Sequence, residues 1–269
     1  MSRSTAAMRM AARAMIETDR LLGVTDVPGA VGASVSENAV AAPVPEATST
    51  APVTDTEGSN PPRPLPAPAI DPVSLDEDVV AALERLESLH AERCGHCTNS
   101  TTHRSVVFGD GDPHASVMFV GEAPGAEEDR TGRPFVGPAG ELLDRMIESV
   151  GLSREGVYIG NIIKVRPQEN RTPSPDECEV CGPWLLAQIA VIRPRVVVAL
   201  GATPTKYLLQ TTTGITRLRG CSSRIRIGDF SVPVVPTFHP AYVLRQYTPE
   251  VRRAVWEDLK QAVAISGED

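Results

Sequence analysis

Two pairs of cysteines have a spacing that could do chemistry. Two residues separate Cys94 from Cys97, and two residues separate Cys178 from Cys181, in a chain with five cysteines. Four thiolates from two such pairs can hold a tetrahedral zinc ion or an iron–sulfur cluster. One pair alone could equally be two small core residues, but two pairs favour a metal site. Ligand type does not distinguish the two metals.

A loop rich in glycine, proline and acids is the second chemical feature. The sequence Gly-Glu-Ala-Pro-Gly at 121–125 follows an apolar run and leads, through Glu128 and Phe135, to a helical pattern that starts at Pro138. A loop between a strand and a helix lies at the carboxyl edge of a sheet, where α/β proteins bind ligands. Such a loop could hold a small planar group. The alternative is a plain connection with surface acids, because Gly/Pro loops are common.

Polar side chains accompany other apolar runs in the same way. Asn161 lies inside one run, and His239 follows another. Because parallel strands end at a shared edge, these groups and Glu122 are expected to lie close together. An asparagine in an apolar strand is costly unless its amide is hydrogen-bonded. A structural role for Asn161 and a binding role are therefore both open at this point.

The elements that must position these residues follow an alternating pattern. Four short apolar runs are separated mostly by helical patterns, and a final helical pattern follows them. The runs are 116–120, 157–163, 196–200 and 232–235, and the helical patterns are 138–150, 176–192 and 249–264. Alternation of this kind is typical of a parallel sheet covered on both faces. The sequence therefore predicts an α/β fold, a three-layer α/β/α domain with a central, mostly parallel four-stranded sheet.

The N-terminal part has a different composition. Residues 1–27 predict a short helical segment, and residues 28–73, rich in Pro and Ala, predict a disordered linker. Proline-rich residues 61–68 could be a recognition arm for another protein. The folded domain is predicted at 74–269, starting with a capping box at Ser74.

Charge and hydropathy limit the partners. The net charge is −8, but residues 1–93, with 14 acidic and 7 basic side chains, carry −7 of it. The nearly neutral remainder can therefore carry a local basic groove. No apolar run approaches the roughly 18 residues that a membrane span needs. The first 22 residues only faintly resemble a transit peptide, because acids interrupt them. Cysteine pairs without a secretory apolar segment predict a reducing, cytoplasmic location.

Taken together, the motifs resemble the family 4, iron–sulfur uracil-DNA glycosylases over about residues 80–265. The resemblance is carried by Gly-Glu-Ala-Pro-Gly-x-x-Glu-Asp at 121–129, Thr-Gly-Arg-Pro-Phe-Val-Gly at 131–137, Asn-Ile-Ile-Lys-x-Arg-Pro at 161–167, Asn-Arg-Thr-Pro-x-Pro at 170–175 and Pro-Thr-Phe-His-Pro at 236–240. The motifs occur in the family's order and spacing. Their combination is specific, whereas none of them would be specific alone.

The resemblance implies a reaction, a pocket and a partner. The reaction is hydrolysis of the N-glycosidic bond of uracil in DNA after base flipping, which leaves an abasic site for base-excision repair. The implied partner is uracil-containing DNA, bound by a monomer. The implied catalytic residues are Glu122, Glu128 and His239; the uracil pocket comprises Gly121, Ala123, Pro124, Gly125, Phe135 and Asn161; and the candidate DNA contacts are Lys164, Arg166, Arg171, Arg219 and Arg245.

One position departs from the family pattern. The family's third cluster cysteine follows the lysine of Asn-Ile-Ile-Lys, and this chain has Val165 there. We therefore expect a 4Fe–4S cluster rebuilt on Cys94, Cys97, Cys178 and Cys181, with zinc as the alternative. In the family the cluster is structural, so altered ligands need not abolish activity.

Two other functions compete with the enzyme. One is a non-catalytic, metal-containing nucleic-acid-binding module with the same fold, and the other is a related glycosylase for deaminated purines. Intact Glu122, Phe135, Asn161 and His239 favour the enzyme, because a pure binding module would have little need of all four.

Overall fold

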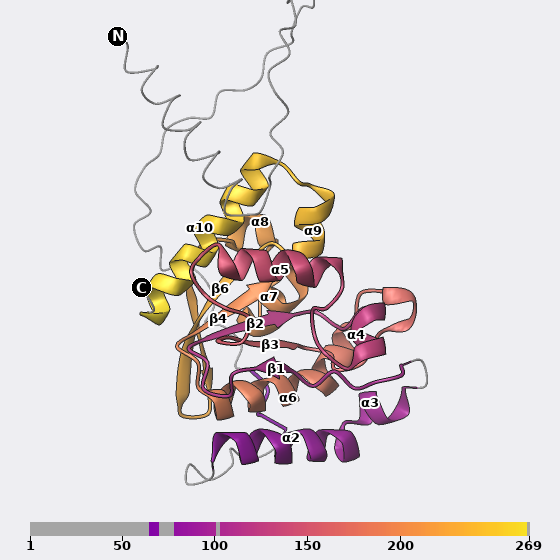
Figure 1. Ribbon diagram of the computed structural model, residues 1–269. Helices are drawn as coiled ribbons and strands as arrows, with labels where there is room; N and C mark the ends of the chain where they lie inside the picture. Colours follow the sequence, from indigo (N-terminus) through magenta and orange to yellow (C-terminus); the bar gives the residue numbers. More distant parts are fainter. Residues whose placement is uncertain (1–64, 70–77, 101–102, 268–269) are drawn as a thin grey trace, which may run out of the picture.

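The computed structural model describes residues 65–69, 78–100 and 103–267 (Figure 1). The predicted N-terminal helical segment and most of the predicted linker lie outside these residues, as does the predicted cap at Ser74. The first described helix, α2 (Val79–Arg93), starts with Asp78 as its N-cap, whose carboxylate accepts a hydrogen bond from the Ala81 amide.

A single sheet organises the domain. Its strand order is β1-β3-β2-β4-β6-β5, and β3, β2, β4 and β6 run parallel. The strands are β1 (Asp110–Gly111), β2 (Val117–Gly121), β3 (Tyr158–Asn161), β4 (Val196–Leu200), β5 (Ser223–Ile227) and β6 (Phe230–Thr237). The four parallel strands are the four predicted runs, so the predicted α/β class and the mostly parallel sheet are confirmed.

The sheet has two antiparallel edge strands that the four-stranded prediction omits. In β1, a side chain at Gly111 would meet the carbonyl oxygen of Val157 at 1.9 Å, so this two-residue strand carries a glycine and no apolar run. In β5, Ile225 and Ile227 are buried while the arginines between and before them are exposed. Such alternation marks a strand that is covered on one face only, and it is weaker in sequence than a continuous apolar run.

Helices cover both faces of the sheet in the predicted three layers (Figure 1). From β2, Val117 and Phe119 point into the core under α5 (Pro138–Glu148) and α10 (Pro249–Ser266). Met118 and Val120 point to the opposite core, which α6 (Pro175–Ile192) and α7 (Ala202–Leu209) cover. Helix α2 packs on α6 on its outer side. Alternate side chains of one strand thus serve two cores, as the period of a strand requires.

Short helices follow the strands at their carboxyl ends. Helix α4 (Ala126–Thr131) follows β2, and α9 (Pro240–Arg245) follows β6. The remaining short helical segments are α3 (Gly95–Asn99), which precedes β1, α8 (Ile215–Leu218) and a 3-10 turn (Gln168–Asn170). None of the helices within the described ranges is both long enough and apolar enough to cross a membrane.

Part of the predicted linker contacts the domain. The amide of Ala69 donates a hydrogen bond to the carbonyl of Pro183 in α6 (3.3 Å), and Leu65 packs against the α6 core. Pro183 interrupts the hydrogen bonding inside α6. Residues 65–69 therefore lie on the domain. The structure does not describe the other residues of the predicted linker, 28–64 and 70–73.

Candidate active site and metal site

A cavity of about 520 Å³ lies at the carboxyl edge of the parallel strands. It is lined by residues that follow all four of these strands. From the predicted site it collects Glu122, Ala123, Pro124, Gly125, Glu128, Phe135, Asn161, Arg171, His239 and Arg245. The topology therefore brings together side chains that are more than a hundred residues apart in sequence.

The floor of the cavity is built on Gly121. Gly121 and Asn161 are direct partners in the register of β2 and β3. A Cβ at position 121 would lie 2.3 Å from the Asn161 amide oxygen and 2.7 Å from the Phe135 ring, so only glycine allows both side chains to come this close. The Asn161 side chain is 1% exposed, and its Oδ1 has no hydrogen-bond partner among the described residues. Leaving a buried acceptor unpaired costs about 1–3 kcal/mol, so this oxygen is ready for a ligand that donates a hydrogen bond.

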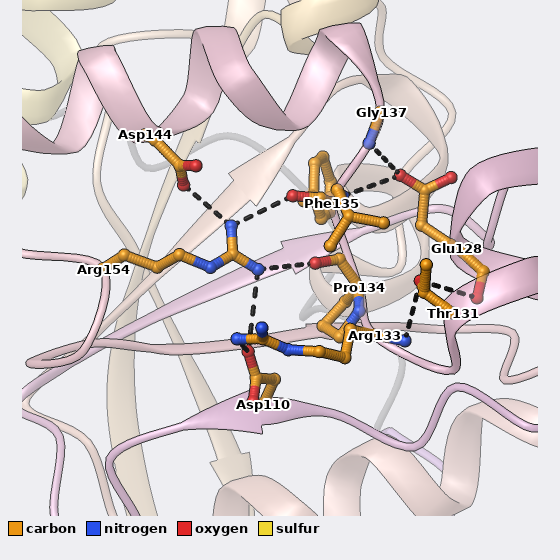
Figure 2. A network of polar contacts seen from close by, with 10 residues as sticks. Asp110, Glu128, Thr131, Arg133, Pro134, Phe135, Gly137, Asp144 and Arg154 are labelled. Carbon is orange, nitrogen blue, oxygen red and sulfur yellow. Dashed lines mark hydrogen bonds and ion pairs between the residues drawn. The ribbon is translucent and has the colours of Figure 1, made fainter.

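The loop that carries Phe135 is held from outside the cavity by Arg154 (Figure 2). Phe135 has a left-handed backbone (φ 51°), an unfavourable conformation for a bulky side chain. The Arg154 guanidinium donates to the carbonyl oxygens of Pro134 (2.6 Å) and Phe135 (3.0 Å), and it pairs with Asp144 (2.7 Å). Arg154 thereby fixes the backbone from which the aromatic ring enters the site.

Glu128 supports the same loop from the other side (Figure 2). Its carboxylate accepts hydrogen bonds from the backbone amides of Gly125 (3.0 Å), Val136 (2.9 Å) and Gly137 (3.0 Å). One carboxylate therefore joins the loop after β2 to the start of α5. The three hydrogen bonds use both carboxylate oxygens of Glu128 to position the loop after β2 and the segment before α5. Glu122, by contrast, lines the cavity and accepts one side-chain hydrogen bond, from the hydroxyl of Thr203.

His239 caps the N-terminus of α9. Its Nδ1 accepts a hydrogen bond from the Ala241 amide (3.1 Å). Burial, with a smaller effect from the positive charge of Arg245, lowers the pKa of His239 to about 4. The ring is therefore neutral at physiological pH, and because Nδ1 accepts, its proton lies on Nε2. The ring centroid is 5.7 Å from that of Phe135, so a hydrogen-bond donor stands beside the aromatic surface.

Three of the predicted DNA contacts lie at or near the mouth of the cavity. Arg171 and Arg245 line it and are exposed. Arg171 pairs with Glu177 (2.6 Å), and the half-buried Arg166 donates to the Asn170 side chain (2.7 Å). Arg171 and Arg245 therefore bring guanidinium groups to the cavity, although Glu177 pairs with the first of them.

The structure corrects the prediction for Lys164 and Arg219. Lys164 is fully buried, and its ammonium donates to the Asn161 carbonyl (2.8 Å) and to the Gln188 side chain, so a phosphate cannot reach it. Arg219 donates two hydrogen bonds to the buried Asp258 carboxylate (2.8 and 3.1 Å), away from the cavity. Gln188 and Asp258 come from distant helices, α6 and α10, and the local sequence gives no sign of them.

The metal-ligating side chains assemble differently from the prediction. The ligand atoms of His90, Cys94, Cys97 and Cys181 all lie within 4.8 Å of one another, and all four residues are buried. The sulfurs of Cys97 and Cys181 are 3.7 Å apart. Three thiols and an imidazole fit a metal site by ligand type and by spacing.

Cys178 does not belong to this group. Residues three apart on a helix differ by about 60° in direction, and α6 presents Cys181 to the ligand group while Cys178 lines another cavity beside Tyr207 of α7. Burial raises the pKa of the Cys178 thiol to about 11. The structure therefore gathers three of the four predicted cysteines with His90 and leaves Cys178 apart, which differs from the predicted grouping. The missed signal was the four-residue spacing of His90 and Cys94, which places both on one helix face.

Comparisons with known proteins agree with this geometry. Residues 108–260 match the family model of the uracil DNA glycosylase superfamily. A type-4 uracil-DNA glycosylase from Thermotoga maritima is 46% identical over 183 residues, which cover 66% of this chain and 94% of the relative. One from Archaeoglobus fulgidus is 40% identical over 192 residues, or 69% and 95%. A type-5 uracil-DNA glycosylase from Thermus thermophilus is 36% identical over 118 residues, or 38% and 53%. The chain belongs to the uracil-DNA glycosylase superfamily and, within it, to the type-4 uracil-DNA glycosylases.

Proposed function

We propose that this protein is a hydrolase that removes uracil from DNA by cleaving the N-glycosidic bond, which leaves an abasic site for base-excision repair. The observation that carries the proposal is the unpartnered, buried amide oxygen of Asn161 beside Phe135. A base that leaves the DNA stack needs an aromatic surface and a hydrogen-bonding edge. This cavity offers both at its floor.

The Asn161 amide suits uracil better than cytosine. Its oxygen accepts from the N3–H of uracil, and its NH2 group donates to O4. Cytosine has no proton on N3 and has an amine at C4, so both contacts would be lost and the buried amide would stay unpaired. Loss of a hydrogen bond that a site is built to make discriminates strongly between substrates.

His239 is proposed to stabilise the leaving group. As the bond between uracil N1 and the sugar C1′ breaks, its electron pair leaves with uracil and negative charge develops on O2. The Nε2–H of neutral His239 donates to this oxygen, a preorganised contribution that needs no proton uptake. Because Nδ1 is held by the Ala241 amide, the donor keeps its tautomer throughout.

Glu122 is proposed to act on the sugar side. A carboxylate stabilises an oxocarbenium-like sugar and accepts a proton from the water whose oxygen bonds to C1′. Glu128 has its carboxylate on three backbone amides, so we assign it the positioning of the loops that carry Glu122 and Phe135. Arg166, Arg171 and Arg245 are assigned to phosphate contacts that orient the DNA without reading its sequence.

The metal is proposed to be structural. The site joins α2 and α3 to α6, and the segment before α6 contributes Asn170 and Arg171 to the cavity wall. The resemblance implies a 4Fe–4S cluster, with zinc as the alternative. Broad visible absorbance with bound iron supports the cluster, and colourless protein with bound zinc supports the alternative.

Location and assembly complete the proposal. A DNA repair hydrolase acts where the DNA is, so the proposal includes the predicted cytoplasmic location. It also includes the prediction that the protein binds DNA as a monomer. The recognition arm at 61–68 stays a prediction.

A single assay tests the activity. A DNA strand with one uracil is incubated with the protein and then treated with alkali, which cleaves abasic sites. We expect cleavage that requires uracil and that falls about 10²- to 10³-fold in His239→Ala, the range for loss of one preorganised donor, and strongly in Asn161→Ala. Arg253→Ala, which alters an exposed ion pair, should leave the rate unchanged. A folded, metal-loaded protein that binds DNA without cleavage would instead indicate the non-catalytic binding module.

A further inference from the structure

His90 is a buried polar side chain at the interface of α2 and α6. It is 0% exposed, and neither ring nitrogen has a hydrogen-bond partner among the residues that the structure describes. Its ring stands edge-on to Trp184 (centroids 5.2 Å apart, 89°) and 5.6 Å from Phe108. Aromatic contacts hold the ring in place, but they satisfy neither nitrogen. Buried polar groups without a partner require an explanation.

The groups that could satisfy it are the three thiols. His90 is in the last turn of α2 and precedes Cys94 by one helical turn, so both face the same side. Cys97 arrives from α3 and Cys181 from α6, and all the ligand atoms lie within 4.8 Å of the His90 nitrogen and of one another. Three cysteines and one histidine are a common ligand set of closed structural metal sites.

Val165 explains why a ligand must come from α2. The position at which the resemblance expects a cysteine is occupied by a valine that is 1% exposed and packs in the same core as Cys94, Cys97 and Cys181. An isopropyl group cannot bind a metal. The other cysteine on α6, Cys178, lies outside the ligand group.

We propose that His90 is the fourth metal ligand of this protein and replaces the sulfur that Val165 removes. The site then has three thiolates, from Cys94, Cys97 and Cys181, and one neutral imidazole. With one ligand on α2, the metal clamps α2 directly to α6. This inference concerns the ligands alone, so it holds for either metal and does not depend on glycosylase activity.

X-ray absorption at the metal edge of the purified full-length protein tests the ligand set without DNA. For zinc we expect three sulfur neighbours and one nitrogen neighbour, at about 2.3 Å and 2.0–2.1 Å. For a four-iron cluster, in which bridging sulfides supply most neighbours of every iron, we expect one nitrogen neighbour among the four irons. A metal with sulfur neighbours alone would overturn the proposal, since the only further cysteine near α6 is Cys178. Elemental analysis of the same sample identifies the metal.

Matched variants test the two candidates against each other. His90→Ala should release metal to a chelator more than ~10-fold faster than the wild type, since even the loss of a supporting partner of a ligand costs 10- to 100-fold. Cys178→Ala should keep its metal. The opposite result, with metal retained by His90→Ala and lost by Cys178→Ala, would restore the four-cysteine prediction and overturn ours.

A third variant guards against misfolding. His90→Cys keeps four ligands and should bind metal with four sulfur neighbours, which shifts the spectrum from that of the wild type. If His90→Ala does not fold, the wild-type and His90→Cys spectra still decide the question, because identical spectra would exclude His90 as a ligand. A protein with three sulfurs and one nitrogen but without uracil cleavage would refute the proposed function and leave this inference standing.

Discussion

The candidate base pocket and the candidate metal site of this protein were predicted from similar signals, yet the structure gathers the predicted residues only at the pocket. In the pocket, Glu122, Phe135, Asn161 and His239 meet around one cavity. In the metal site, Cys178 is absent from the ligand group and His90 takes part. Both predictions used short motifs at characteristic spacing. The difference lies in what positions the motifs.

Topology positions the pocket. Parallel strands that share a sheet must end at a common edge, and the register then fixes the neighbours, as in the direct pairing of Gly121 with Asn161. A prediction of four parallel strands therefore already places the loops. The metal site depends on how α2 and α6 are rotated about their own axes. A three-residue spacing leaves two cysteines about 60° apart on a helix, and only packing decides which of them reaches α3.

The two regions touch through Lys164. Its ammonium joins the Asn161 carbonyl, at the pocket, to Gln188 of α6, the helix that carries Cys181. Variants should nevertheless separate the regions, because Gly121→Ala and Arg154→Ala alter the pocket at residues outside the group of four candidate ligands.

The largest effect is expected from Gly121→Ala. The added methyl would lie 2.7 Å from the Phe135 ring and 2.3 Å from the Asn161 oxygen, so the pocket floor must spread. A displacement of about 1 Å at a reacting centre costs on the order of 10²-fold in rate, and overpacking costs about 1–3 kcal/mol of stability. Uracil removal under single-turnover conditions and thermal unfolding measure both effects.

Gly214→Ala is the matched control for Gly121→Ala. The methyl at position 214 would have a single neighbour, at 4.0 Å, so rate and stability should stay close to those of the wild type. Metal content should be unchanged in both variants. Loss of metal in Gly121→Ala would break the distinction between the two regions.

A smaller effect is expected from Arg154→Ala, which acts on the pocket from behind. The change leaves the carbonyls of Pro134 and Phe135 without their guanidinium donor. Unpaired buried groups cost about 1–3 kcal/mol, so kcat/KM should fall by about tenfold or more. Steady-state kinetics measure the fall. Arg154→Lys should recover only part of it, because an ammonium lacks the planar fork of a guanidinium.

Arg253→Ala provides the comparison for Arg154→Ala. Arg253 forms an ion pair with Glu257 in which both side chains are more than half exposed, and such pairs contribute little. Equal losses in the two arginine variants would show that Phe135 does not depend on Arg154 for its position.

The sequence thus predicts local patterns better than contacts between residues that are far apart in the chain. The strand runs and the polar residues at strand ends are local patterns, and the structure has them where they were expected. The burial of Lys164, the pairing of Arg219 with Asp258 and the inward direction of His90 each need a partner on a distant helix. From sequence alone, a lysine at a strand end indicates a phosphate contact. Only the structure shows that Lys164 is buried and donates to Gln188 instead. The β5 edge was missed for a related reason, since one covered face leaves no continuous apolar run.

The smallest effect is expected from acid, and it distinguishes the pocket's neutral histidine from an ordinary one. With a pKa of about 4, His239 stays neutral and keeps Nδ1 as an acceptor down to about pH 5.5, where an unperturbed histidine with a pKa of about 6.5 would be roughly nine-tenths protonated. The single-turnover rate on uracil DNA should therefore change less than about twofold from His239 between pH 8 and pH 5.5, measured on samples whose metal content is verified at each pH. The folded pKa lies below the unfolded one, so the unfolded chain binds more protons in this window, and the contribution of His239 to stability falls as pH drops from 6.5 towards 4. Melting temperatures of the wild type and His239→Gln should converge over that range. A rate that drops tenfold by pH 5.5 with metal retained would mean that His239 takes up a proton in this range. The proposal that a neutral His239 donates from Nε2–H would then be wrong.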